Sequence, residues 1–490
     1  MLFKKENIIS LVFFVLCGSL YSQGNPGISF GGQKNENGFN IIACDDGGFL
    51  IGGSTKSFGY GSSDMLAIKI DHNANIEWMN AYGWPHHDVC RSVVEVNDGY
   101  IIMGDAWDWG HILLDMFIIK TDLSGNLLWH KYYGTDAQDF GFDIKLTNQG
   151  DLLLLGYTRG IDPAGDLLLV KIDQEGNELW RNNYGSQYDD YGFELEIRDD
   201  NTILLVGSKA GFYHDVASAT YYNVHDADIL LISVDNNGDE IWRHVYGGDS
   251  HDFGNSVFSI GDEIFIGGST QSQGNGSFDM YLSKTDSQGN ILWSNTFGGE
   301  EYEYANSICM NTEGNIYVLG SSKSYGKDGS ADIYLVKTNN NGDEIWNLSL
   351  GGSFLDIGKE VIPTPDGGAL ILGNTNSFGN GGTDILLIKV SKDGAVENIL
   401  SNGGEPYYGE PQLYPNPISE YGYFKSISSN QIPELFLEVI SISGQVLNTY
   451  TINAPDYQFS INNLSSGVYI YNIRKDEASG VIFRGKLIVR

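Results

Sequence analysis

The sequence is short of basic residues and of recognisable catalytic motifs, and each shortage excludes a class of protein. Only 28 Lys and Arg stand against 63 Asp and Glu, which gives a formal net charge of −35. A surface of this charge repels phosphate backbones and anionic headgroups, so nucleic acid and membrane surfaces are excluded as expected partners. The chain contains no His-Glu-x-x-His, nucleophile elbow or phosphate loop, so no motif assigns it to a class of enzyme.

Long apolar runs are absent except near the N-terminus, where the pattern is typical of an export signal. Lys4 and Lys5 precede an apolar run over residues 8–20, and small residues follow near Ser22. We predict a signal peptide over residues 1–22, with a membrane anchor as the alternative. A lipoprotein anchor at Cys17 is disfavoured, because Leu16 stands where such signals need a small residue.

Cysteine is scarce as well. The signal peptide contains one of the four cysteines, which leaves Cys44, Cys90 and Cys309. An odd number at these spacings fits neither a disulfide framework nor a metal motif. All three fall on predicted strands, so we expect buried free thiols and a fold that depends on its apolar core.

An internal repeat dominates what the sequence does contain. A tryptophan ends the phrase Asp-x-x-Gly-Asn-x-x-Trp, or a close variant of it, at intervals of 51, 51, 62, 51 and 53 residues. A second marker, an aspartate before an apolar strand, occurs seven times, and so does a third, the pattern acidic-x-small-x-x-apolar. The members of the three series are Trp78, Trp129, Trp180, Trp242, Trp293 and Trp346; Asp64, Asp115, Asp166, Asp228, Asp279, Asp332 and Asp384; and Glu36, Asp88, Asp139, Asp190, Asp252, Glu303 and Asp356.

Each unit is expected to form four antiparallel strands. In the unit that begins at Asp252 the predicted strands cover residues 255–260, 263–269, 280–285 and 291–297, with glycine in the turns between them. Four-stranded units of about 50 residues indicate an all-β fold, a seven-bladed β-propeller over residues 23–404. A solenoid is the alternative, but it needs capping ends that are not visible.

Closure of the ring is expected to involve the N-terminal segment. Residues 27–32 resemble the end of a fourth strand, whereas the last unit carries Asn398 where the others carry tryptophan. We therefore expect residues 27–32 to pair with or beside this last, weak strand.

The repeat resembles a known family. The phrases Phe-Gly-Gly, acidic-x-Gly-x-x-Ile, Asp-Gly-Gly, Gly-Ser-Thr and Asp-x-x-x-x-Lys-x-Asp-x-x-Gly-Asn-x-x-Trp follow one another over residues 27–404. This order resembles the bacterial seven-bladed β-propeller repeat family. The resemblance implies the fold and leaves the function open, because propellers serve as binding platforms, adhesins and enzymes.

Residues 405–412 form a predicted linker, and the segment that follows has a different composition. Alternating apolar residues predict six or seven short strands over residues 413–490, a small immunoglobulin-like β-sandwich. The opening Tyr414-Pro415-Asn416-Pro417, the strand with Gly467 and Tyr469, and the basic-apolar end resemble the type A sorting domain of the type IX secretion system. A plain immunoglobulin-like accessory domain is the alternative.

The second resemblance implies a route and a location. It implies export across the inner membrane of a Gram-negative, Bacteroidetes-type cell and passage over the outer membrane by the type IX machinery. The sorting domain would then be removed, and the product released or attached to surface lipopolysaccharide.

Acidic residues of the repeat suggest metal binding, but a structural role suits them better. A ring formed by the series from Glu36 to Asp356 could hold calcium. Its presence in all seven units favours carboxylates that accept backbone hydrogen bonds. The turn at residues 235–240 resembles part of a calcium loop but lacks the other ligand positions. The tryptophans are expected to pack between blades, so we predict no cofactor and leave calcium open.

Two units depart from the repeat in loops that are rich in aromatic residues and histidine. Aromatic side chains among carboxylates on loops are typical of sugar or peptide binding, although drift of surface loops explains them equally well. The candidate ligand-binding residues are Trp84, His86, Trp107, Trp109 and His111 in the second unit, and Tyr213, His214, Tyr221, Tyr222 and His225 in the fourth.

The sequence favours a non-catalytic, monomeric binding or adhesion propeller at the cell surface, with a glycan or a surface protein as ligand. A secreted carbohydrate-active lyase or hydrolase and a structural spacer remain the alternatives.

Overall fold

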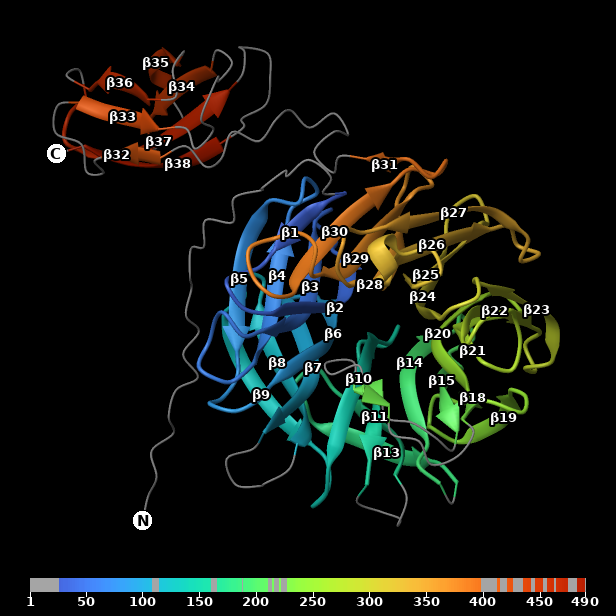
Figure 1. Cartoon of the computed structure of the whole chain (residues 1–490). Helices are drawn as coiled ribbons and strands as arrows, with labels where there is room; N and C mark the ends of the chain where they lie inside the picture. The colour runs from blue at the N-terminus through green and yellow to red at the C-terminus, as the bar shows by residue number, and fades with distance from the viewer. Residues whose placement is uncertain are drawn as a thin grey trace. The chain divides into compact units, whose positions relative to one another are not determined.

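The computed structural model divides into two compact units, residues 1–399 and 400–490, and each is described by itself. The first is described at residues 26–107, 114–159, 165–186, 188–209, 214–215, 220–221 and 227–397 (Figure 1). The second is described at residues 412–414, 421–425, 435–441, 446–452, 456–461, 464–474 and 483–489. The predicted signal peptide lies outside the described residues. Among those residues, no helix has the length and apolar character needed to cross a bilayer.

The first unit is the predicted seven-bladed propeller (Figure 1). Six blades are four-stranded antiparallel sheets whose strands follow chain order from the inner edge to the outer, and the seventh is completed from two places in the chain. Blades 1 to 3 contain β2 (Glu36–Ala43), β3 (Phe49–Thr55), β4 (Asp64–Ile70) and β5 (Ile76–Tyr82); β6 (Val89–Val96), β7 (Gly99–Trp107), β8 (Leu114–Asp122) and β9 (Leu127–Tyr133); β10 (Asp139–Leu146), β11 (Leu152–Thr158), β12 (Asp166–Ile172) and β13 (Glu178–Tyr184). Blades 4 to 6 contain β14 (Tyr191–Ile197), β15 (Ile203–Lys209), β18 (Asp228–Val234) and β19 (Glu240–Tyr246); β20 (Asp252–Ile260), β21 (Glu263–Thr270), β22 (Asp279–Thr285) and β23 (Ile291–Phe297); β24 (Glu303–Met310), β25 (Ile316–Ser322), β26 (Asp332–Thr338) and β27 (Glu344–Leu350).

The seventh blade closes the ring with the N-terminal segment, as expected. It contains β28 (Asp356–Pro363), β29 (Ala369–Thr375) and β30 (Asp384–Val390). The outer edge of β30 pairs with β31 (Val396–Glu397) at Lys389 and Val390 and with β1 (Ile28–Phe30) at residues 385–387. Ile28 and Phe30 are buried in a core cluster shared by blades 1 and 7, so the two chain segments together replace one fourth strand.

The predicted strands of the fifth blade agree with the structure to within one residue at each end, except at the start of the first. The fourth strand matches at both ends, but β20 begins at Asp252, three residues before the predicted start. Residues 252–254 pair with β21, and the register then skips Asn255. A β-bulge of this kind adds one unpaired residue and locally disrupts the ladder, and the turn residues on which the prediction relied do not reveal it.

The repeated tryptophans pack between blades. Trp78 on β5 donates its indole N–H to the Leu123 carbonyl in the β8–β9 hairpin of the next blade, at 3.0 Å. In that hairpin Gly125 has φ +76°, and an added Cβ would lie 2.8 Å from the indole ring. Trp346 repeats the contact with the Lys392 carbonyl at 3.2 Å. The Gly of the repeat phrase thus permits both the tight turn and the close approach of the neighbouring tryptophan.

The three cysteines are free thiols in the described structure; Cys44 and Cys90 are buried and Cys309 is partly buried. Burial raises the pKa of the Cys44 and Cys90 thiols to about 12. Both thiols therefore stay protonated and inert at neutral pH.

The second unit is a two-sheet β-sandwich. One sheet has the order β32 (Gln412–Tyr414), β33 (Tyr421–Lys425), β36 (Asp456–Ser460), and the other β35 (Val446–Ile452), β34 (Leu435–Ile440), β37 (Gly467–Arg474), β38 (Phe483–Val489). Phe459 of the first sheet and Leu437, Ile452 and Leu487 of the second share one buried cluster. Among the predicted sorting residues, Tyr414 lies on β32 and Gly467 and Tyr469 on β37, whereas Pro415, Asn416 and Pro417 lie outside the described residues.

Candidate binding site

The acidic residue at the start of each first strand joins the loops of one face. We call the segment that connects two blades a blade link, and the loop between the second and third strands of a blade its 2–3 loop. Glu303 accepts the Gly299 N–H of the preceding link at 2.7 Å and the Ser324 N–H of its own 2–3 loop at 3.0 Å. Its backbone N–H donates to Phe278 in the 2–3 loop of the preceding blade. Blade links and 2–3 loops therefore form one face, hereafter the loop face.

The same arrangement recurs around the ring. Glu36, Asp88, Asp139, Asp252 and Asp356 each accept a link N–H, at 2.5–2.9 Å. These carboxylates thus perform the structural role that the sequence favoured for them. No group of three or more His, Cys, Asp or Glu side chains is placed to hold a metal ion anywhere in the described part of the chain.

The glycines of the blade links lie between two carboxylates. A Cβ added to Gly298 would lie 2.1 Å from Asp279 Oδ1 and 2.4 Å from Glu303 Oε2. A Cβ on Gly83 would lie 2.7 Å from Asp64 Oδ1 and 2.4 Å from Asp88 Oδ2. The two acidic series of the repeat therefore meet at each of these glycines, which explains why both series accompany it in the repeat.

Three of the predicted ligand-binding residues gather around Asp88 on the loop face. The Asp88 carboxylate accepts the Trp84 N–H at 2.6 Å and the Trp107 N–H at 3.2 Å. The rings of His86 and Trp107 have their centroids 5.8 Å apart, and His86 is exposed. Trp84 instead donates its indole N–H to the Tyr132 hydroxyl at 2.6 Å. Trp84 therefore anchors the link, while exposed His86 and half-buried Trp107 form an aromatic pair.

Burial raises the pKa of the Asp88 carboxyl to about 7, with a smaller contribution from the like charge of Asp64. The two backbone N–H groups oppose that shift. Near neutral pH the Asp88 carboxyl group, which supports the aromatic pair, is thus partly protonated.

The other predicted ligand-binding residues belong to loops that the structure describes only in part. In blade 4, β16 (His214–Asp215) pairs with β17 (Thr220–Tyr221), which sets His214 opposite Tyr221 in the register. Trp109, His111, Tyr213, Tyr222 and His225 lie outside the described residues.

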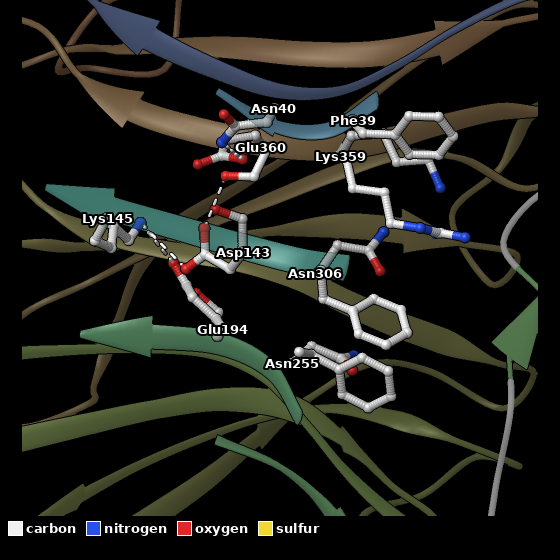
Figure 2. Close-up of a pocket in the computed structure, with 15 residues that line it drawn as sticks. Phe39, Asn40, Asp143, Lys145, Glu194, Asn255, Asn306, Lys359 and Glu360 are labelled. Atoms are coloured by element: carbon white, nitrogen blue, oxygen red, sulfur yellow. Dashed lines mark hydrogen bonds and ion pairs between the residues drawn. The ribbon is translucent and has the colours of Figure 1, made fainter. Parts of the chain in front are cut away.

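The central channel holds a second group of candidate residues, which sequence reasoning missed. Each first strand carries a bulge three residues after its acidic marker. The bulge layer, formed by the skipped residues, comprises Phe39, Arg91, Phe142, Phe193, Asn255, Asn306 and Lys359. All seven line a cavity of about 130 Å³ (Figure 2).

The residues that follow the bulges form a second layer, joined by hydrogen bonds from blade to blade. The Val93 N–H donates to Asn40 Oδ1 at 2.9 Å and the Leu195 N–H to Asp143 Oδ2 at 3.0 Å. Ser92, Glu194, Ser256 and Ser307 likewise accept an N–H of the next blade. Glu360 completes the ring by accepting the Asn40 side-chain N–H at 2.9 Å.

This hydrogen-bonded layer contains more carboxylates than cations. Lys145 Nζ lies 3.5 Å from Asp143 Oδ2 and 3.8 Å from Glu194 Oε1 (Figure 2). Burial raises the pKa of Glu194 to about 7, against the opposing charge of Lys145. Burial, followed by the like charge of Glu194, raises the pKa of Glu360 to about 8. Glu360 is therefore mostly protonated at neutral pH.

The bulge layer, unlike the hydrogen-bonded layer, contains cations and no carboxylates. Arg91 donates from Nε to Asp105 Oδ2 at 2.8 Å and lies 5.2 Å from the Phe142 ring centroid and 6.0 Å from that of Phe39. Lys359 has no hydrogen-bond or ion-pair partner among the described residues. Burial and the like charge of Arg91 lower its pKa to about 8.

The sequence did contain a signal for this cavity. The bulge position is occupied by phenylalanine, asparagine, arginine or lysine in different units, and the next position is always polar, as asparagine, serine, aspartate or glutamate. This pair of positions would have indicated a lining of the channel, if the bulge had been anticipated.

Comparison with known proteins identifies the second unit. Residues 412–490 match the family described as secretion system C-terminal sorting domain. This segment is a type IX sorting domain, which places the chain among secreted or cell-surface proteins of Bacteroidetes-type cells and implies contact with the secretion machinery.

Relatives outside that segment are distant. The chain is 25% identical over 267 residues to the regulatory protein FlaEY of Caulobacter vibrioides, covering 51% of this chain and 26% of FlaEY. It is thus similar to about a quarter of that protein. The Neurospora crassa Pan2 WD40 domain has 11% identity and a TM-score of 0.43, with 77% of this chain and 93% of that one covered. PorZ, a surface component of the type IX secretion system of Porphyromonas gingivalis, has 11% identity and a TM-score of 0.41, with coverage of 94% and 60%.

Proposed function

We propose that this protein is a non-catalytic binding propeller of the cell surface that takes a glycan on its loop face. The single observation that supports this most directly is the pair formed by exposed His86 and half-buried Trp107 on the loop face, supported by Asp88. An aromatic ring held at a fixed position offers an apolar face to the C–H side of a sugar, and the imidazole adds a hydrogen bond.

The support beneath the pair favours binding over drift of surface loops. Trp84 stands where several other units carry glycine, and its backbone N–H keeps the hydrogen bond to the blade carboxylate. Trp107 stands where other units carry long polar residues such as Lys56, Gln271 and Lys323, and its backbone N–H donates to Asp88 instead of to a backbone carbonyl. The large side chains are thus added to a loop framework that holds them in place, which lowers the entropy lost when a ligand binds.

The test is affinity electrophoresis of the purified full chain through gels containing a panel of polysaccharides, with reducing ends assayed in the same samples. We expect retardation by at least one polysaccharide and no new reducing ends. Trp107→Ala should weaken the retardation about tenfold, as is usual for a central aromatic contact.

Phe354→Ala is the matched control, because Phe354 is an aromatic residue 63% exposed on the link between blades 6 and 7. Equal retardation of Trp107→Ala and the parent chain would reject the site. New reducing ends would reject the non-catalytic function and favour a carbohydrate-active enzyme. No retardation by any polysaccharide would reject the glycan and leave a protein ligand or a spacer.

A further inference from the structure

The cavity in the central channel is separate from the His86–Trp107 pair on the loop face, and different residues line it. Its volume of about 130 Å³ is below the roughly 300–1,000 Å³ of pockets that enclose a drug-sized ligand. It therefore suits one terminal group of a ligand. The bulge layer lies three residues along each first strand from the carboxylates of the loop face, so the loop face is the nearer end of the channel.

Of the three cations that line the cavity, one has no carboxylate within ion-pair distance among the described residues. Arg91 is paired with Asp105, and Lys145 with Asp143 and Glu194. Lys359 lines the cavity with no ion-pair partner in the described structure, and burial and the like charge of Arg91 lower its pKa. In a chain with a net charge of −35, a partly buried lysine beside an arginine is costly unless an anion joins them.

The remaining polar groups of the bulge layer present acceptors. Asn255 donates its side-chain N–H to the Ala305 carbonyl, and Asn306 donates to the Gly358 carbonyl, both at 2.7 Å. Because each amide uses an N–H group in these bonds, its side-chain oxygen is left to accept from another donor. Neither oxygen accepts a hydrogen bond from a described residue. Phe142 and Phe193, with ring centroids 5.6 Å apart, supply an apolar wall.

We propose that the channel cavity binds the carboxylate-bearing terminal sugar of an acidic glycan, with Lys359 contacting the carboxylate. A sugar acid carries one negative charge, several hydroxyl donors and an apolar C–H face, which correspond to Lys359, the two asparagine oxygens and the phenylalanine wall. A peptide C-terminus matches less well, because it has one N–H donor within reach of two acceptors. The site is independent of His86 and Trp107.

The test uses the full chain and ligand-observed NMR titration with glucuronate, glucuronamide and N-acetylglycine. We expect saturable binding of glucuronate and at least tenfold weaker binding of the uncharged amide and of N-acetylglycine. Lys359→Met should weaken glucuronate binding about tenfold, and Lys359→Arg should retain it. Lys56→Met, on the exposed 2–3 loop of blade 1, should change nothing.

The thermal midpoint distinguishes a variant that has lost a contact with the ligand from a variant that no longer folds. Because Lys359→Met removes an uncompensated cation, its thermal midpoint should equal or exceed that of the parent chain. Equal affinity for glucuronate and glucuronamide, or unchanged binding by Lys359→Met, would overturn the proposal. Preference for N-acetylglycine would overturn the sugar in favour of a peptide terminus. Trp107→Ala should leave glucuronate binding intact, so the loop-face site and this one fail or succeed separately.

Discussion

At the scale of single residues, the same acidic residue type meets two different environments in this propeller. The carboxylates of the loop face accept backbone N–H groups, which compensate for their burial. Glu360 in the channel accepts one side-chain N–H, and burial together with the like charge of Glu194 raises its pKa. The first arrangement recurs around the ring because it builds the fold. The second depends on the residue that follows each bulge, which is a carboxylate at Asp143, Glu194 and Glu360 and an asparagine or serine in the other units.

Glu360 gives a prediction on pH. Its pKa is raised from an ordinary 4.5 to about 8, so the folded chain binds this proton more tightly than the unfolded chain does. The resulting stability is fully present below about pH 4.5 and is lost as the pH rises through 8. Glu360→Gln keeps an acceptor for Asn40 and removes the titration. It should match the parent at pH 4.5 and exceed its unfolding free energy by about 1–3 kcal/mol at pH 8.5, measured by urea unfolding.

Glu175→Gln is the control for that measurement, because Glu175 is exposed in the turn between β12 and β13. It should follow the parent curve at every pH. An unfolding free energy of Glu360→Gln that ran parallel to the parent between pH 5 and 8.5 would contradict a protonated Glu360.

At the scale of strands and blades, the sequence predicted the fold and missed the channel for one physical reason. Strand position follows from glycine turns and apolar alternation, both of which are local, so β23 was predicted at both ends. A bulge breaks the alternation by one residue and moves the side chain that follows it. Arg91 and Lys359 were therefore not expected to face the channel, and their proximity also depends on closure between blades 7 and 1. The aromatic residues near Asp88 were predictable because they replace repeat residues in the link before blade 2 and at the start of its 2–3 loop.

Ring closure gives a prediction at this scale. Phe30 is 2% exposed and packs in the cluster that joins blades 1 and 7, while β1 is only three residues long. Phe30→Ala should lower the unfolding free energy of the propeller by about 3–5 kcal/mol and speed hydrogen exchange along β30. Ser29→Ala, a neighbour that is only partly buried, should cost less than about 1 kcal/mol. Similar losses for the two variants would show that β1 does not fasten the ring.

At the scale of the whole molecule, the two units divide the work. The propeller forms its own core around seven blades, and the sandwich buries Leu437, Phe459 and Leu487 in a cluster of its own. A strongly acidic surface keeps such a protein soluble outside the cell. The sorting domain can then be removed without disrupting the core of the propeller.

Deletion of residues 412–490 tests that division. Because the two units have separate cores, the shortened chain should fold and show the same propeller unfolding transition as the full chain. It should nevertheless accumulate in the periplasm, since residues 412–490 match the sorting domain that the type IX machinery reads. The measurement is cell fractionation with protease accessibility on intact cells, with the full chain as the surface-exposed control. Normal delivery of the shortened chain to the surface would show that the address lies in the propeller, and an unfolded product would show that the propeller depends on the sandwich.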